Sequence, residues 1–143
     1  MSNRPDIVES AGAAEPVGAY PHARRVGDLL FLSGIGPRVR GERAIPGVVL
    51  DAQGRVVDYD IAAQCHSVMR DVRAVLDEAG SSWDKLVDVT VFLTDIERDF
   101  ATYNRIYAEY FPGPARPCRT TVEVRRLPTP IAIELKCVAV LDR

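Results

Sequence analysis

The strongest constraint on the fold is an amphipathic helix in the middle of the chain. Apolar residues recur there with the 3.6-residue period of an α-helix. They are Ile61, Cys65, Val68, Met69, Val72, Val75, Leu76 and Ala79. Asp58 or Asp60 can cap the start of this helix, and Gly80 can end it. A helix with one apolar face buries that face against another layer, which the rest of the chain must provide.

Segments with strand-like composition surround this helix. A second helix is expected over residues 99–111, where aromatic side chains provide bulk and Pro112-Gly113-Pro114 stops it. The expected strands cover residues 29–34, 48–50, 56–57, 87–93, 120–124 and 131–141. The long segment from Ile35 to Asp58 contains several turn signals.

The order of these elements predicts the architecture. A strand, a helix and a strand in the second half of the chain require a crossover connection. We therefore expect an α+β fold with one mixed β-sheet and two helices packed on one face. The chain has no third layer for the other face. The expected cover is another copy of the protein, with sites possible at the subunit boundaries.

Size and composition predict one ordinary globular domain. With 143 residues, 47% hydrophobic and 27% charged, the chain has enough apolar material for a core. We expect a flexible N-terminal segment over residues 1–15 and a single domain over 16–143. The net charge of -2 argues against a nucleic-acid partner. No run of about 18 apolar residues and no hydrophobic signal core occurs, which predicts no membrane association and a cytoplasmic location.

The few metal-ligating residues point away from a metal site. The chain has two histidines, and its three cysteines form no CxxC pair. We expect reduced thiols, no metal and no cofactor. Cys118 lies beside Arg119 without a histidine near it in sequence, so we interpret it as a spectator thiol. Cys65 and Cys137 fall on predicted core faces.

Two charged residues in the last strands indicate chemistry. Arg119 begins one strand-like run, and Glu134 stands among apolar neighbours in the next. An arginine fork suits a planar carboxylate, and a glutamate in a partly dry site can activate water. Strand alternation places Arg119 and Thr121 on one face, which favours Thr121 as a pocket residue. The competing interpretation is a buried cross-strand ion pair without catalytic function.

Several motifs in order resemble one known family along nearly the whole chain. The pieces are Pro16-Val17-Gly18-Ala19-Tyr20, Leu32-Ser33-Gly34, Phe100-Ala101-Thr102-Tyr103-Asn104, and Arg119-Thr-Thr-Val-Glu-Val-x-x-Leu-Pro followed by Ile133-Glu134. The chain resembles the Rid (reactive intermediate deaminase, YjgF-like) family. The resemblance implies a chorismate-mutase-like fold and a homotrimer with active sites between subunits. It also implies hydrolysis of an enamine or imine to a carbonyl compound and ammonia.

The resemblance also implies roles for single residues. Arg119 would bind the substrate carboxylate, and Glu134 would handle the hydrolytic water. Tyr20, Gly34 and Asn104 would line or shape the pocket. From the residues alone, Tyr20 is equally well a subunit contact and Asn104 a surface or capping residue, and Gly34 provides a left-handed or close-approach backbone position.

Two departures from the family pattern bear on the substrate. Many imine-deaminating members have a cysteine where this chain has Thr121, and the segment from Ile35 to Asp58 is longer than their compact turn. The chain looks most like the 2-aminomuconate deaminase branch, which acts in aromatic catabolism. The alternatives are a general deaminase of 2-imino acids and a trimer that binds small carboxylates without turnover. The loop arginines Arg38, Arg40 and Arg43 are either solvated or extend anion recognition toward a dicarboxylate.

Overall fold

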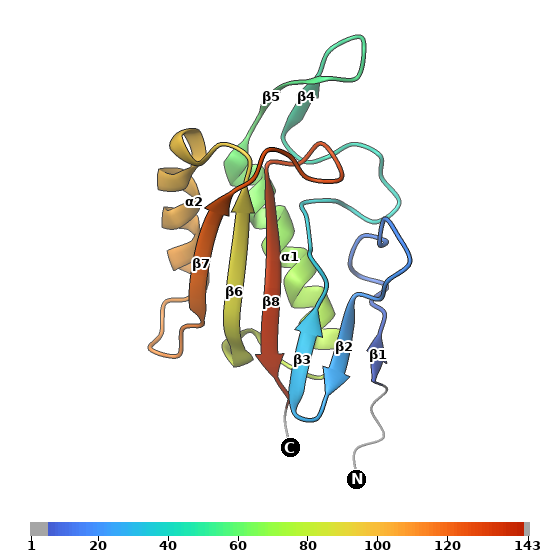
Figure 1. The fold of residues 1–143 in the computed structure, drawn as a ribbon, viewed down its shortest axis with the longest axis vertical. Coiled ribbons are helices and arrows are strands. Elements are labelled where there is room, and N and C mark those ends of the chain that lie inside the picture. The colour runs from blue at the N-terminus through green and yellow to red at the C-terminus, as the bar shows by residue number, and fades with distance from the viewer. Residues whose placement is uncertain (1–5, 142–143) are drawn as a thin grey trace.

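A six-stranded sheet with two helices on one face forms the body of the protein (Figure 1). The computed structural model describes residues 6–141. The strand order is β1-β2-β3-β8-β6-β7, and among the described strands only the β6–β7 pair is parallel. The elements of the sheet layer and its helices are β1 (Ile7–Val8), β2 (Ala23–Val26), β3 (Leu29–Leu32), α1 (Ile61–Glu78), β6 (Leu86–Leu93), α2 (Ile96–Tyr110), β7 (Cys118–Glu123) and β8 (Ile133–Val140). The predicted α+β fold, a mixed sheet with both helices on one face, is confirmed.

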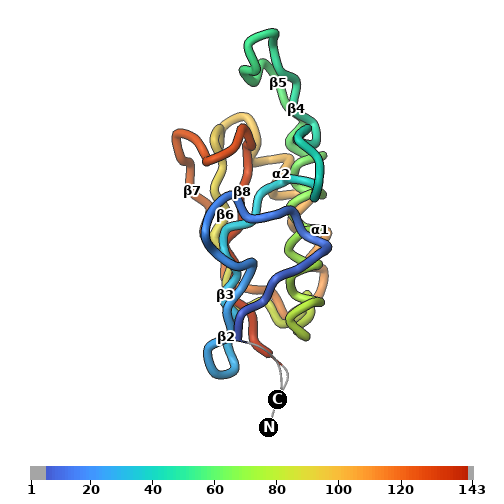
Figure 2. The backbone as a smooth tube through the Cα atoms, turned by 90° about the vertical axis from the view of Figure 1, so that its right-hand side faces the viewer, coloured from blue at the N-terminus to red at the C-terminus, as the bar shows by residue number. Residues whose placement is uncertain are grey.

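A separate two-stranded hairpin, β4 (Val48–Leu50) with β5 (Val56–Tyr59), projects beyond the end of the sheet (Figure 2). Its position explains the long connection before α1, because the chain leaves the sheet after β3 and returns at the helix cap. A short 3₁₀ helix, Trp83–Lys85, precedes β6. Within residues 6–141, no helix combines the length and hydropathy that crossing a bilayer requires.

The central helix α1 follows the sequence prediction. Asp60 is the N-cap, and its carboxylate accepts hydrogen bonds from the backbone N–H groups of Ala62 and Ala63. Gly80, with φ of +77°, adopts the left-handed conformation that ends the helix. The apolar stripe of α1 is buried against the sheet, which supplies most of the core.

The second helix starts earlier than the sequence predicted. It begins at Ile96 rather than at Asp99, because Asp95 caps it by accepting a hydrogen bond from the N–H of Arg98 at 3.1 Å. Glu123 at the end of β7 accepts a second bond from the N–H of Ile96 at 2.9 Å. These two carboxylates satisfy N–H groups of the first turn and fix the helix to the sheet.

The N-terminal segment differs from the flexible segment expected over residues 1–15. Within its described part, β1 pairs with β2, and Val8 and Ala13 are buried. Arg40 donates hydrogen bonds to the carbonyls of Ser10 and Ala13, both at 2.8 Å. His22 accepts a hydrogen bond from the N–H of Ser10 at 2.9 Å. The segment is ordered by polar partners that lie far away in sequence, so its composition alone does not reveal them.

The sheet face opposite the helices carries apolar side chains that no other layer covers within residues 6–141. Leu29 and Phe31 of β3 are each 39% exposed, and Val122 of β7 is 37% exposed. Their register partners on the neighbouring strands point to this same open face. An exposed apolar face of this kind is typical of a protein interface, and the homo-oligomer stays a prediction.

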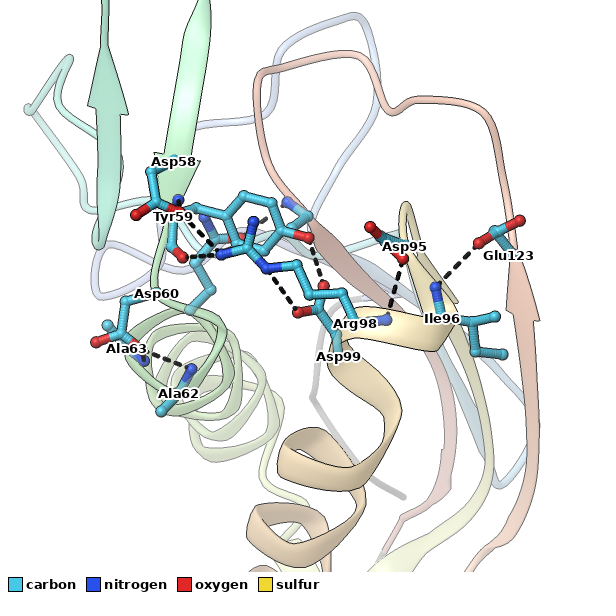
Figure 3. A network of polar contacts seen from close by, with 12 residues as sticks. Asp58, Tyr59, Asp60, Ala62, Ala63, Asp95, Ile96, Arg98, Asp99 and Glu123 are labelled. Carbon is cyan, nitrogen blue, oxygen red and sulfur yellow. Dashed lines mark hydrogen bonds and ion pairs between the residues drawn. The ribbon is translucent and has the colours of Figure 1, made fainter.

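A polar network around the buried Asp99 holds the hairpin to the start of α2 (Figure 3). The hydroxyl of Tyr59 donates a 2.5 Å hydrogen bond to Asp99, which is fully buried. The Arg98 guanidinium lies 3.8 Å over the Tyr59 ring and donates a 3.0 Å bond to Asp58. Burial raises the pKa of Asp99, since water is excluded from its charged form. The other carboxylate oxygen of Asp99 receives no hydrogen bond from the described part of the chain.

We expect Tyr59→Phe to destabilise the fold by about 1–3 kcal/mol, because it removes the donor to a buried carboxylate and keeps the ring under Arg98. Urea unfolding followed by circular dichroism measures this change. Tyr110→Phe is the matched control, since it removes a 2.7 Å hydrogen bond between the Tyr110 hydroxyl and the exposed His66. Equal stability losses in the two variants would show that the bond from Tyr59 to the buried Asp99 contributes no more than an exposed hydrogen bond.

Candidate active site

Glu134 projects from β8 onto the open face of the sheet. Its neighbours Ile133 and Leu135 are buried against the helices, so alternation turns the glutamate to the other side. The side chain is half-buried, and this burial raises the pKa of Glu134 above its ordinary value. The positive charge of Arg38 acts in the opposite direction. A carboxylate with a raised pKa is a stronger base than an ordinary glutamate, which suits it to take a proton from water.

Gly34 leaves the space that the Glu134 side chain occupies. The chain after β3 runs beside β8, where Ile35 and Leu135 exchange backbone hydrogen bonds of 2.8 and 2.9 Å. A Cβ atom on Gly34 would lie 3.0 Å from both Cδ and Oε2 of Glu134. The φ angle of Gly34 is not positive, so the glycine is required for close approach and not for a left-handed conformation.

We expect Gly34→Ala to reduce turnover by about tenfold or more, because the new methyl group must push the Glu134 carboxylate from its position. The fold should be retained, since the backbone angles suit alanine. Steady-state kinetics of the ammonia release that the family resemblance implies measures the effect. Gly113→Ala is the control, since a Cβ at Gly113 meets no atom within 4 Å. Unchanged kinetics for Gly34→Ala would show that the Glu134 position is not critical.

Tyr20 and Arg38 complete a group around Glu134. With Gly34 and Glu134 they line a hollow of about 40 Å³, and we call these four residues the Glu134 half-site. Tyr20 is 41% exposed, and its hydroxyl accepts a 3.2 Å hydrogen bond from the N–H of Val17. The sequence analysis placed Arg38 in a loop and did not link it to Glu134. The turn through Gly36 and Pro37 brings Arg38 back to the sheet, and composition does not predict this turn.

Arg119 lies in a second group, at the β7 edge of the sheet. Its guanidinium stands over the rings of Tyr107 at 4.7 Å and Tyr103 at 5.3 Å, both on α2. The Tyr103 hydroxyl makes a 2.9 Å hydrogen bond with the Thr121 hydroxyl. Arg119 and Thr121 therefore point to the same face, as alternation predicted. We call Arg119, Thr121, Tyr103 and Tyr107 the Arg119 half-site.

The remaining predicted residue, Asn104, is exposed on α2 next to Tyr103. The two tyrosines of the Arg119 half-site were expected only as aromatic bulk. Their spacing of one helical turn, together with an arginine that faces α2, was the signal that could have identified them.

The two half-sites are on opposite sides of the sheet. Arg119 is the register partner of Val89, which faces the helices, and Glu134 is the partner of Phe92, which faces the open side. β6 separates the two strands. Arg119 and Glu134 are two strand spacings apart across the sheet, and their partners Val89 and Phe92 are three residues apart along β6. Their Cα atoms are therefore roughly 14 Å apart. The interpretation of Arg119 and Glu134 as an ion pair is therefore wrong within one chain. For the same reason, these two residues of one chain do not bind one small substrate together.

Other hollows and the cysteines lie away from both groups. A hollow of about 640 Å³ lies between β1 and the end of α1, and one of about 380 Å³ lies between the hairpin and residues 125–132. Burial raises the pKa of Cys65 and Cys137 to about 12, which keeps these thiols protonated, while Cys118 is exposed. Residues 6–141 contain no cluster of three His, Cys, Asp or Glu side chains able to hold a metal ion.

A mixed sheet in this strand order with two helices on one face is the YjgF-like fold, which the solved structure of the Escherichia coli YjgF gene product shares. Residues 11–141 match the family described as "Endoribonuclease L-PSP". A RutC family protein of Pyrococcus abyssi is 37% identical over 135 residues, covering 94% of this chain and 95% of its own. The chain therefore belongs to the Rid/YjgF/RutC family.

Two further relatives carry informative names. A protein named Reactive Intermediate Deaminase A, chloroplastic, from Arabidopsis thaliana is 31% identical over 140 residues, which cover 98% of this chain and 68% of that protein. The crystal structure of Escherichia coli TdcF with bound serine superposes with a TM-score of 0.81 at 29% identity. It covers 96% of this chain and all of TdcF.

Proposed function

We propose that this protein is a hydrolytic deaminase that converts an enamine or imine carboxylate to the oxo acid and ammonia, with 2-aminomuconate as its substrate. The half-buried Glu134 carboxylate, with its raised pKa, facing a hollow beside an arginine carries this proposal. The family includes a plant protein named for deaminase activity, and TdcF was solved with the small carboxylate serine. The branch with 2-aminomuconate as substrate is supported by the sequence motifs and the long segment before α1.

We propose further that the two half-sites are completed between copies in a homotrimer. The Glu134 hollow of about 40 Å³ is far smaller than the roughly 300–1,000 Å³ of an ordinary ligand pocket. The β7 edge of one copy on the open face of the next would enlarge it and cover the apolar side chains there. The two contacting surfaces are different, so this interface is heterologous, and a threefold rotation between copies would close it into a ring. The family resemblance gives three as the number of copies.

The chemistry follows from the groups. Arg119 of one copy holds the substrate carboxylate through two parallel hydrogen bonds and so positions the imine carbon. Glu134 of the next copy takes a proton from water as the water oxygen bonds to that carbon and the C=N electrons move to nitrogen. The proton then passes from Glu134 to the amine. As the C–N bond breaks, the carbinolamine hydroxyl returns its proton to Glu134, the carbonyl forms and ammonia leaves. One water is consumed for each ammonia, and an iminium carbon is electrophilic enough without a metal.

The test is ammonia release from 2-aminomuconate generated enzymatically, compared with 2-iminopropanoate generated by an amino-acid oxidase. We expect release from 2-aminomuconate well above the spontaneous rate, and a trimer by light scattering. Faster release from 2-iminopropanoate would favour the general 2-imino acid deaminase. Binding of small carboxylates without release from either compound would favour the non-catalytic trimer.

A further inference from the structure

Arg38 is a half-buried arginine beside the candidate catalytic carboxylate. It lines the same hollow as Tyr20, Gly34 and Glu134. One of its N–H groups donates a hydrogen bond to the backbone carbonyl of Glu15. Among residues 6–141, no carboxylate lies within ion-pair distance of its guanidinium. Its charge acts on Glu134 and Asp71 only at longer range, and both effects lower the pKa of those carboxyl groups.

Other arginines of the fold are used differently. Arg40 is occupied by the carbonyls of Ser10 and Ala13 and lies 3.6 Å from the Glu15 carboxylate. Arg98 binds Asp58 and covers Tyr59. Arg38 alone of these three lines the hollow with Glu134. A guanidinium has five N–H donors in a planar fork, so most of the donors of Arg38 remain available to a ligand in the hollow.

We infer that Arg38 forms a second carboxylate-binding subsite, which makes the substrate of this protein a dicarboxylate. This inference rests on the proposed deaminase function. Arg119 of the neighbouring copy would hold the carboxylate next to the imine carbon, and Arg38 would hold the distal carboxylate on the Glu134 side. A bidentate guanidinium contact supplies both affinity and orientation. The subsite selects a substrate with a charge at its far end and places the reacting carbon near Glu134.

Arg38→Gln tests this subsite, with Arg40→Gln as its matched control. Both arginines hold the segment of residues 10–15 through backbone carbonyls, but Arg40 does not line the hollow. We expect Arg38→Gln to raise KM for 2-aminomuconate relative to KM for 2-iminopropanoate on the order of 10- to 100-fold. Arg40→Gln should change neither value. Arg38→Lys should have a KM for 2-aminomuconate between those of the wild type and Arg38→Gln, because an ammonium keeps the charge but lacks the planar fork of donors.

Several outcomes would overturn the inference. Equal losses on both substrates would mean that Arg38 acts through Glu134 or through the fold. An unchanged KM for 2-aminomuconate would mean that no subsite exists.

Equilibrium binding tests the subsite separately from catalysis. Muconate and 2,4-hexadienoate have the same carbon chain and differ only in the second carboxylate. The wild type should bind muconate more tightly by calorimetry, and Arg38→Gln should abolish this difference. If the wild type deaminates neither substrate yet shows the preference, the deaminase proposal fails and the subsite stands. If it shows no preference, the subsite fails.

Discussion

Arg119→Ala should nearly eliminate ammonia release and leave the protein folded. Arg119 is exposed on the edge strand β7, where it stacks on Tyr107 and Tyr103 and forms no ion pair with Glu134 of its own chain. Loss of the stacking should cost less than about 1 kcal/mol of unfolding free energy. Loss of the carboxylate anchor should reduce kcat/KM on the order of 10³-fold, because the imine carbon is then no longer positioned. Kinetics with 2-aminomuconate and thermal unfolding measure the two effects.

Arg105→Ala is the control for the first substitution. Arg105 is exposed on α2 and lies 3.7 Å from Glu109, one turn further along the helix. The substitution also removes one positive charge, from a residue of neither half-site, so activity and stability should stay close to wild type. A collapse of stability in Arg119→Ala would instead assign Arg119 a structural role.

Glu134→Gln should lower kcat by roughly 10²- to 10⁴-fold, the usual contribution of a general base. The amide keeps the size of the side chain and cannot take a proton from water. In the wild type, the raised pKa of Glu134 should place the acidic limb of the kcat/KM profile above the pH range of an ordinary glutamate. Stopped ammonia assays across pH measure both quantities. Glu123→Gln is the control and should retain activity, because Glu123 is the register partner of Leu93, which faces the helices and not the Glu134 side.

The same substitution has a stability signature with a defined sign. Burial raises the folded pKa of Glu134 above its unfolded value, so the folded state binds more protons between the two values. Stability therefore falls as pH rises through this window. Glutamine removes the ionisation, so Glu134→Gln should gain stability relative to wild type at pH 8 and not at pH 4. A variant that loses stability at pH 8 would contradict the burial argument.

The sequence was sufficient for the elements with a strong local pattern. The apolar period and the Asp60 cap define α1, and alternation defines the facing of Arg119 and Thr121. β1 and β2 were missed because they are short and β2 contains two arginines, so that pairing rather than composition makes them strands. The start of α2 was predicted late because Asp95, not Asp99, is its cap.

The relation between the two half-sites could not be predicted from the sequence. Whether Arg119 and Glu134 share a face depends on the register of β7 and of β8 against β6, which lies between them. A shift of one residue in either register would reverse the outcome. The position of Arg38 depends in the same way on long-range structure, because its loop returns to β8 only after β3 and β8 have paired.

The placement of Arg119 and Glu134 on opposite faces has a genetic consequence under the proposed assembly. An allele that lacks Arg119 and an allele that lacks Glu134 would complement each other in one cell, since a mixed ring can still join an intact arginine to an intact glutamate. An allele that lacks both would damage the sites on either side of its subunit. In a mixed ring, one such copy would inactivate two sites and not one, although it folds normally.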